Sequence, residues 1–409
     1  MFDLFNKSRF SGHHGTIAGL AISPDGSKAV SGANNSQFFD RDAIVWHLPS
    51  GERDRLLRGH EVAIFSVAFS NDGRTIATGG GGAVKGRQWK HDNAIRLWND
   101  RGEEIAKFGE DLFFVRALAF SPDGRFLLSG SANQAKAAPV ADGSCLRLWD
   151  LRTRREVRRF GHHTSEANTI AFSPDGKYVA AGSNGMRADG SVAGSVTIKT
   201  SFHKKDAPLP AGKSALTKEL LAEYANGGSL RKDVAQSLKT LAEKLNPARL
   251  VSVSVTHHEQ SSALEYQTIR FWETSSGREL DLFAHQSWVN ALAFSPDGKR
   301  LLSAGKGVIL WDTSSGEKVG RVGGNEIDFT HCAAFSPDGQ HIALGTGGRM
   351  DMGSPYENCF TRLYSQDTGQ ELARWSHKFP VTALAFSPDG RFVLAGGEHG
   401  ELHLWPTVI

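Results

Sequence analysis

The sequence has few cysteines, little net charge and no long apolar run. Only three of its 409 residues are cysteines, Cys145, Cys332 and Cys359, and their spacing fits neither a disulfide framework nor a metal site. The 47 basic and 44 acidic residues nearly cancel, so net charge gives no reason to expect nucleic-acid binding. No apolar run approaches the roughly 18 residues that a membrane span needs. The first residues, MFDLFNKSRF, lack the apolar core of a signal peptide. We therefore expect reduced thiols, no metal, no membrane span and a cytoplasmic location.

What the sequence does have is a phrase of six residues that returns along the chain. It reads AFSPDG at 119–124, 171–176, 293–298, 334–339 and 385–390, with the near-copies AISPDG at 21–26 and AFSNDG at 68–73. Proline presets its own backbone angle, aspartate hydrogen-bonds the local backbone and glycine tolerates positive φ, so each phrase predicts a tight turn. Alternating apolar residues flank every copy. Seven copies therefore predict seven hairpins in a repeat array.

Two other residue types recur at fixed distances from the turn phrase. A histidine precedes five of the seven phrases, and a tryptophan or tyrosine ends a short alternating strand after each one. The histidines are His13, His60, His163, His285 and His377, and the aromatic residues are Trp46, Trp98, Trp149, Trp272, Trp311, Tyr364 and Trp405. Alternation over so short a span indicates strands with one buried face.

With Gly59-His60, the repeated FSPDG and Leu-Trp-Asp at 148–150 and 310–312, the sequence resembles a WD40-repeat protein over nearly its whole length. The resemblance implies an all-β fold, a seven-bladed β-propeller with four antiparallel strands per blade, formed as a single domain by residues 1–409. We expect the N-terminal segment, about residues 2–10, to supply the outer strand of blade 7 and so to close the ring. The resemblance also implies structural hydrogen-bond networks, formed by His60, Thr78, Asp92 and Trp98 in blade 2 and by His13, Ser31, Asp40 and Trp46 in blade 1.

One interval between turn phrases is much longer than the others. Successive turn glycines are 41 to 52 residues apart, except that 122 residues separate Gly176 from Gly298. The additional residues form an insertion in blade 4, at 195–266. We expect strands at 195–202 and 250–256 and helices at 214–224 and 229–245. These would make a β-stalk with a helical hairpin that packs over the ring or against a partner.

The insertion also contains a short motif that resembles part of a nucleotide-binding loop. Gly212-Lys213-Ser214 matches the end of a phosphate-binding loop, but Ala207 stands where that loop requires glycine. Pro208 and Pro210 remove two backbone donors that such a loop uses. We therefore expect no cofactor.

The start of each innermost strand should place side chains at the mouth of the central channel. In similar WD40 proteins these positions often grip a partner peptide, and aromatic and arginine side chains are common in binding hot spots. The predicted partner-binding residues are Phe65, Phe114, Arg116, Glu166, Trp288, Asn290, Phe329 and His331. The alternative is that long loops or the insertion cover the mouth, in which case these aromatic residues belong to the core.

The connection between the second and third strands of blade 2 is a second candidate site. Its glycine-rich part, 79–87, favours a flexible loop, and Arg87, Trp89 and Lys90 give it basic and aromatic character. Such a cluster could hold an acidic peptide or a nucleic-acid strand by charge and stacking. A solvated surface loop is the simpler interpretation.

No pattern in the sequence matches a catalytic site. We therefore predict a non-enzymatic, intracellular scaffold, a monomeric propeller within a complex, that binds a protein or peptide through its loop-rich face and channel mouth. The alternative is a propeller enzyme or small-molecule binder that uses the polar side chains of Arg116, Glu166 and His331 in the channel.

Overall fold

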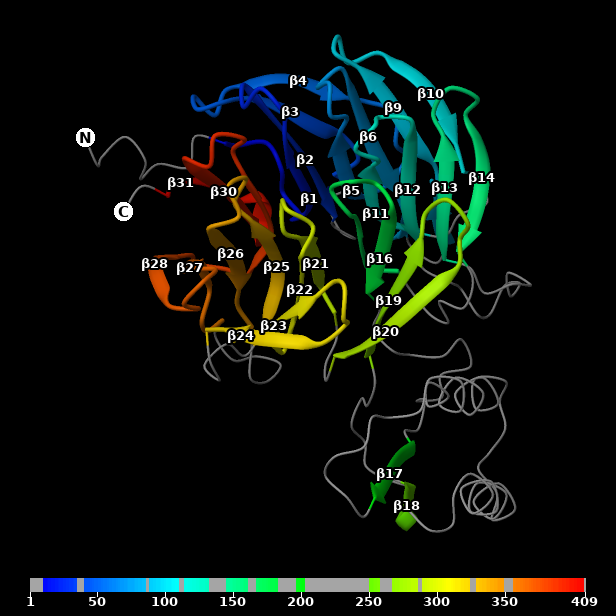
Figure 1. Cartoon of the computed structure of the whole chain (residues 1–409). Helices are drawn as coiled ribbons and strands as arrows, with labels where there is room; N and C mark the ends of the chain where they lie inside the picture. The colour runs from blue at the N-terminus through cyan, green and yellow to red at the C-terminus, as the bar shows by residue number, and fades with distance from the viewer. Residues whose placement is uncertain are drawn as a thin grey trace. The chain divides into compact units, whose positions relative to one another are not determined.

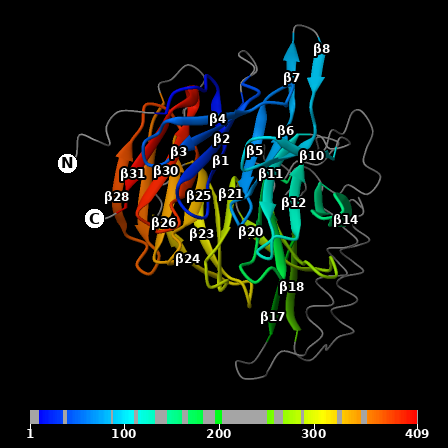
Figure 2. The same ribbon diagram turned by 90° about the horizontal axis from the view of Figure 1, so that it is seen from above.

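The computed structural model shows a ring of β-sheets (Figures 1 and 2). It describes residues 10–34, 40–85, 88–109, 114–131, 145–160, 167–182, 196–202, 250–257, 267–285, 289–323, 329–348 and 356–407. The chain divides into two compact units, one formed by Met1–Ala193 with Leu264–Ile409 and the other by Gly194–Ala263. The first unit contains the ring.

Seven antiparallel sheets, each a blade, follow one another around the ring. The first three blades consist of β1 (Thr16–Ile22), β2 (Lys28–Asn34), β3 (Ala43–His47) and β4 (Arg53–Leu57); β5 (Ile64–Phe69), β6 (Thr75–Gly80), β9 (Ile95–Asn99) and β10 (Glu104–Phe108); and β11 (Val115–Phe120), β12 (Phe126–Ser131), β13 (Leu146–Asp150) and β14 (Arg155–Phe160). Blades 4 and 5 consist of β15 (Thr169–Phe172), β16 (Tyr178–Gly182), β19 (Gln267–Glu273) and β20 (Glu279–His285); and β21 (Ala291–Phe294), β22 (Arg300–Gly305), β23 (Gly307–Asp312) and β24 (Lys318–Val322). Blades 6 and 7 consist of β25 (Thr330–Phe335), β26 (His341–Thr346), β27 (Phe360–Ser365) and β28 (Glu371–Ser376); and β29 (Val381–Phe386), β30 (Phe392–Gly397) and β31 (Leu402–Pro406). The predicted seven-bladed propeller is therefore confirmed.

The first strand of each blade lies toward the middle of the ring, and the last strand lies at its outside (Figure 1). Blade 7 meets blade 1 through the Thr382 hydroxyl, which donates a 2.7 Å hydrogen bond to the carbonyl oxygen of Ile17. Phe10 is buried beside Trp46, with ring centroids 5.5 Å apart, in a cluster that also includes Leu402 and Leu404 of β31. The predicted closing strand lies outside the described residues except for Phe10, and it stays a prediction.

The turn phrase has the local hydrogen bonds that its residues predict. In blade 1 the Ser23 hydroxyl donates to Asp25 Oδ1 at 2.6 Å, and the backbone N–H of Lys28 donates to Ser23 Oγ at 2.9 Å. Gly26 has a φ of +72°, which glycine adopts at little cost. The phrase also joins neighbouring blades, because an added Cβ at Gly73 would contact the Pro24 ring of the preceding turn at 3.4 Å.

The apolar core lies between neighbouring blades. Val30 and Val45 of blade 1, for example, share a buried cluster with Ile64, Ile76 and Trp98 of blade 2. Because each sheet is covered by the next, the closed ring buries faces that a single four-stranded sheet would leave in water.

The described part of the second unit is a pair of antiparallel strands, β17 (Val196–Phe202) and β18 (Leu250–His257). These bounds are within one residue of the two strands expected in the insertion. The two expected helices, at 214–224 and 229–245, lie outside the described residues.

The connection between β6 and β9 differs from our prediction. Residues Gly82–Lys85 (β7) and Gln88–His91 (β8) form an antiparallel pair, with Val84 opposite Trp89. The prediction of a flexible loop over 79–87 is therefore wrong for the residues in β7. Valine and tryptophan favour strands, and that preference outweighs the glycines that precede them.

Candidate functional site

The position of the histidine before the turn phrase is occupied in blades 1 and 2 by His13 and His60, and both rings form hydrogen bonds inside their blades. In blade 2, His60 Nδ1 lies 2.8 Å from Asp92 Oδ2 and His60 Nε2 lies 2.7 Å from Thr78 Oγ1, which also accepts a 2.9 Å hydrogen bond from Trp98 Nε1. Burial lowers the pKa of His60, against the opposing effect of Asp92. The ring is therefore held neutral and engaged on both nitrogens, and it has a structural role.

Blade 1 contains a looser version of the same network. His13 Nε2 lies 2.8 Å from Ser31 Oγ, which accepts a second 2.8 Å hydrogen bond from Trp46 Nε1. The Asp40 carboxylate accepts hydrogen bonds from the backbone N–H groups of His14 and Gly15. The predicted network is therefore complete in blade 2, whereas in blade 1 it joins His13, Ser31 and Trp46, and Asp40 bonds to the backbone beside His13.

Three predicted site residues come together at the start of β5 and β11. The Phe65 and Phe114 rings are 5.5 Å apart, and the Arg116 guanidinium carbon lies 4.8 Å and 5.3 Å from their centroids. Arginine over an aromatic ring is attracted by the negative face of that ring. We call these three residues the mouth cluster. All three side chains are half-buried, so the cluster is partly open to solvent.

Two backbone features position the mouth cluster. Phe114 has a φ of +30°, which is uncommon for a residue with a side chain. Gly81 lies directly under the two rings, since an added Cβ would come within 2.9 Å of Phe114 Cδ1 and closer still to the Phe65 ring. Gly81 begins the connection between β6 and β9, so the cluster lies at the end of the ring where second and third strands are joined.

Arg116 has an unsatisfied donor in this position. Its Nε is buried and has no hydrogen-bond acceptor among the described residues, and no described carboxylate forms an ion pair with the guanidinium. A buried donor without an acceptor costs free energy, and native proteins contain few of them. The guanidinium is thus held against the two rings, with no carboxylate among the described residues to neutralise it.

Three more predicted site residues lie elsewhere around the channel. Asn290 Nδ2 donates a 2.9 Å hydrogen bond to the Thr330 carbonyl oxygen of the next blade, and His331 Nε2 lies 2.7 Å from the Gly347 carbonyl oxygen. These two side chains are already engaged with the backbone. Phe329 is 43% exposed and lies against Gly348, so among the predicted aromatic side chains that the structure describes it is the most open to a partner.

A second aromatic cluster, which the sequence analysis missed, lies between blades 6 and 7. The Phe379 ring is 5.8 Å from Tyr356 and 4.4 Å from His399, and the Tyr356 hydroxyl donates to Glu398. Phe379 precedes Pro380, which occupies in blade 7 the sequence position that Phe114 occupies in blade 3. A search one residue to each side of that position could have found it.

The matching family model is described as WD domain, G-beta repeat, and it covers residues 6–47, 51–99, 102–150, 154–192, 277–312 and 369–406. These six ranges include more than half of the chain, and the repeats fall in blades with the strand order described above. The chain belongs to the WD40 repeat family.

Several curated proteins resemble this WD40 chain along much of its length. A nuclear distribution protein PAC1 from Arthroderma otae is 26% identical over 337 residues, which are 80% of this chain and 65% of that protein. Telomerase protein component 1 from Mus musculus is 25% identical over 392 residues, which are 94% of this chain and 12% of that protein. Cilia- and flagella-associated protein 52 from Chlamydomonas reinhardtii is 23% identical over 272 residues, which are 64% of this chain and 42% of that protein. This chain spans less than two thirds of each relative's own length.

The remaining predicted site residues of this WD40 chain cannot be placed in the mouth cluster. Glu166, Trp288 and Arg87 lie outside the described residues, and Trp89 and Lys90 are described only as backbone positions in β8. Within the described ranges, no group of three His, Cys, Asp or Glu side chains is arranged to hold a metal ion. No helix among those same residues is long and apolar enough to cross a membrane.

Proposed function

We propose that this WD40 chain is a non-enzymatic, cytoplasmic scaffold that binds a protein or peptide through the mouth cluster and the loops beside it. The observation that carries the proposal is Arg116, whose guanidinium lies over two phenylalanine rings while its buried Nε has no acceptor. A carbonyl or carboxylate oxygen from a partner would approach the solvent-open side of this half-buried arginine. Hydrogen bonds to a charged donor are stronger than those between neutral groups.

The backbone of Phe114 supports the same proposal. Residues held at positive φ without being glycine cost free energy, and such strain clusters at binding sites, where it fixes a side chain in advance. Phe329, from another part of the ring, adds an aromatic side chain that is 43% exposed. Aromatic residues around an arginine are the usual composition of a binding hot spot.

The relatives support a role within a larger assembly. Two of them are named as a component of telomerase and as a protein associated with cilia and flagella, and each is much longer than this chain. We infer that this chain, too, works as a rigid module that positions other proteins. The helical hairpin expected within residues 203–248 would either form part of the interface or control access to the mouth.

The test is affinity capture followed by reconstitution with the purified partner and titration calorimetry. We expect Arg116→Ala to weaken binding at least about tenfold, because it removes the donor and the cation that the partner's oxygen meets. The matched control is Arg374→Ala, because Arg374 also lies over a phenylalanine ring, that of Phe360 at 5.8 Å, but is on outer strand β28. That variant should bind as wild type does.

Two further results separate the proposal from its alternatives. A variant that lacks residues 203–248 keeps the partner if the insertion is only a lid, and loses it if the insertion is an interface. If Arg116→Ala and Phe114→Ala both bind the partner with wild-type affinity while their melting temperatures are unchanged, the mouth cluster is not the binding site.

A further inference from the structure

A groove of about 570 Å³ lies between blades 3 and 4, at the end of the ring that carries the turn phrases. Its apolar lining consists of Phe126 and Leu148 from blade 3 and Tyr178 from blade 4, with Val157 of β14 at its outer side. Val157 is 49% exposed. Arg158 closes one side of the groove, because its Nη2 donates a 2.6 Å hydrogen bond to the Ser275 carbonyl oxygen of blade 4.

The groove between blades 1 and 2, of about 460 Å³, has the same construction but a different lining. Arg55 occupies the position of Arg158 and donates a 2.6 Å hydrogen bond to the Asp100 carbonyl oxygen. The bulged residue opposite the strand-ending tryptophan is Asp54 in blade 1 and Val157 in blade 3.

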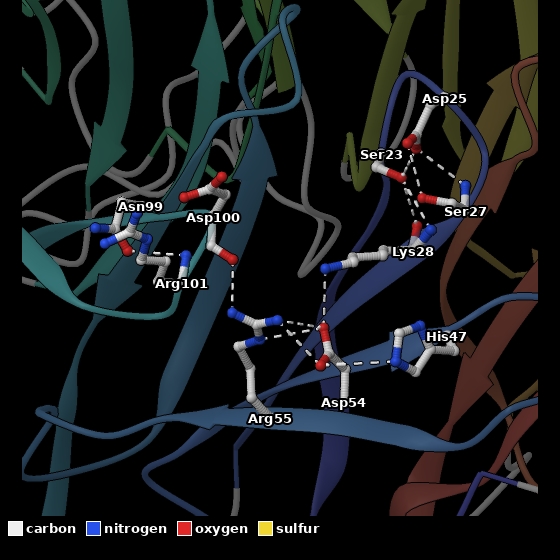
Figure 3. Close-up of polar contacts among 10 residues, drawn as sticks. All are labelled: Ser23, Asp25, Ser27, Lys28, His47, Asp54, Arg55, Asn99, Asp100 and Arg101. Carbon is white, nitrogen blue, oxygen red and sulfur yellow. Dashed lines mark hydrogen bonds and ion pairs between the residues drawn. The ribbon is translucent and has the colours of Figure 1, made fainter.

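Figure 3 shows Asp54 between the side chains of Lys28, Arg55 and His47. Its carboxylate oxygens lie 3.0 Å from Lys28 Nζ, 2.9 Å from Arg55 Nη2 and 3.6 Å from His47 Nε2. Lys28 stands where blade 3 has Phe126, at the second position after the turn glycine. In blade 1 the side chains at these positions form ion pairs with one another. In blade 3 the side chains at the same positions are apolar and face solvent.

An arginine-rich segment adjoins the apolar groove. Residues 152–159 contain five arginines and one acidic residue, Glu156. Glu156 is engaged by Arg147 at 3.1 Å and by Arg159. Arg152, Arg154 and Arg155 are exposed and have no ion pair with any residue that the structure describes. The segment begins beside the groove, because the N–H of Leu151 donates to the carbonyl oxygen of Arg125, which is a lining residue.

We propose that the groove between blades 3 and 4 is a second docking site, for a peptide segment that carries an apolar side chain next to acidic residues. The apolar side chain would lie on Phe126, Leu148 and Tyr178 against Val157, where its burial is favourable in proportion to the apolar area removed from water. The acidic residues would meet Arg152, Arg154 and Arg155. The groove is also lined by Asp123, Asp175 and Glu273. Asp175 pairs with Lys177 at 3.0 Å and Glu273 lies 3.9 Å from Arg278 Nε, so two of these three carboxylates already have a basic partner.

A peptide fits this surface better than a nucleic-acid strand does. Single-stranded nucleic acids bind where open aromatic faces alternate with basic side chains along a groove. Here the Arg125 guanidinium lies 4.7 Å from the centroid of Phe126, so one face of that ring is already covered. The exposed end of the groove is aliphatic, which suits a leucine or isoleucine side chain.

The experiment uses the full chain and a displayed library of random peptides. We expect selection to enrich peptides with an apolar residue flanked by Asp or Glu. The best of them, synthesised with a fluorophore, should bind Val157→Asp at least about tenfold more weakly than wild type. The Arg152→Glu/Arg155→Glu double variant should lose a similar factor, and it provides a second test that leaves the apolar groove intact.

The matched control is Val319→Asp, because Val319 is the equivalent bulged residue of blade 5 and is 51% exposed. It should bind the peptide as wild type does. The proposal is overturned if no enriched peptide depends on Val157, or if Val319→Asp loses as much affinity. It is also overturned if a labelled single-stranded oligonucleotide binds the arginine segment more tightly than any selected peptide. Arg116→Ala should leave this binding unchanged, so the result is independent of the mouth cluster.

Discussion

The side-chain amide of Asn71 donates a 2.7 Å hydrogen bond to the carbonyl oxygen of Pro122, across the boundary between blades 2 and 3. The same Nδ2 lies 3.2 Å from the carbonyl oxygen of Ser121. Asn71 stands where the other six turn phrases have proline. In each of those six blades the proline ring lies next to the turn glycine of the following blade, whereas an added Cβ at Gly124 would contact nothing within 4 Å. A polar contact thus replaces the apolar one in the phrase that lacks proline.

This relationship predicts different effects for two substitutions of Asn71. Asn71→Ala removes the amide donor and adds no contact, and we expect it to lower the free energy of unfolding by about 1–2 kcal/mol. Asn71→Pro restores the ring that the other blades use and restricts the unfolded chain, which is worth about 0.4–1 kcal/mol. Urea unfolding should therefore rank Asn71→Pro above Asn71→Ala. Equal stability of wild type and Asn71→Ala would contradict the role of the amide.

The mouth cluster predicts that Gly81 is intolerant of a side chain. Gly81→Ala would place Cβ within 2.9 Å of Phe114 and closer to Phe65, so both rings must move. Overpacking of this kind costs about 1–3 kcal/mol, and it should weaken partner binding through the displaced rings. Gly348→Ala is the control, because its Cβ would make an ordinary 3.4 Å contact with Phe329. Calorimetric melting of both variants distinguishes them, and equal melting temperatures would show that the rings adapt freely.

The complete network of blade 2 should contribute more stability than the looser one of blade 1. Asp92 accepts hydrogen bonds from His60 and from the Glu61 N–H, and it lies 3.4 Å from Arg96 Nη2. Asp92→Ala leaves the buried His60 Nδ1 without an acceptor and removes one of the two carboxylates that pair with the buried Arg96, which should cost about 3–5 kcal/mol. Asp40→Ala removes only an acceptor for two backbone N–H groups near the surface, so its effect on unfolding by urea should be smaller. The reverse order would mean that the network is not what stabilises blade 2.

The number of blades could be predicted from the sequence because the information is local. Ser23, Asp25 and Gly26 form their turn with one another, so every copy of the phrase specifies a hairpin wherever it occurs. The alternation of the flanking residues then decides which face is buried. The same reasoning placed His60 and Asp92 in a structural network, which the hydrogen bonds confirm.

What a side chain does at the channel could not be read in this way. Asn290 and His331 share a channel position with Phe65 and Arg116, but they form hydrogen bonds with the backbone at Thr330 and Gly347. Those bonds depend on which backbone carbonyl group lies next to the side chain. The spacing of the repeats gives no information about that. The groove beside Val157 was missed for the same reason, because its walls come from two blades.

Buried histidines predict how stability depends on pH. Burial lowers the pKa of His13 to about 4, although the nearby Asp40 carboxylate opposes that change. In the unfolded chain the ring has its ordinary pKa of 6.5, so between pH 6.5 and about 4 the unfolded chain binds a proton that the folded chain excludes. The contribution is therefore present above pH 6.5 and is lost as the pH falls through this range, by up to about 1.4 kcal/mol per pH unit. Burial lowers the pKa of His377 further, to about 3, which acts in the same direction.

We expect the free energy of unfolding of the wild-type protein, measured with urea at a series of pH values, to decrease steadily between pH 6.5 and 4. His13→Gln cannot bind that proton in either state, and its amide can still donate to Ser31. For this variant the plot of unfolding free energy against pH should therefore be less steep than that of wild type between pH 6.5 and 4. The difference in slope should be at most that of one bound proton, and above pH 6.5 the two plots should be parallel. Curves that stay parallel at every pH would show that the folded protein binds the proton at His13 as readily as the unfolded chain does. The histidine would then not be sealed from solvent by the packing of Trp46 against it.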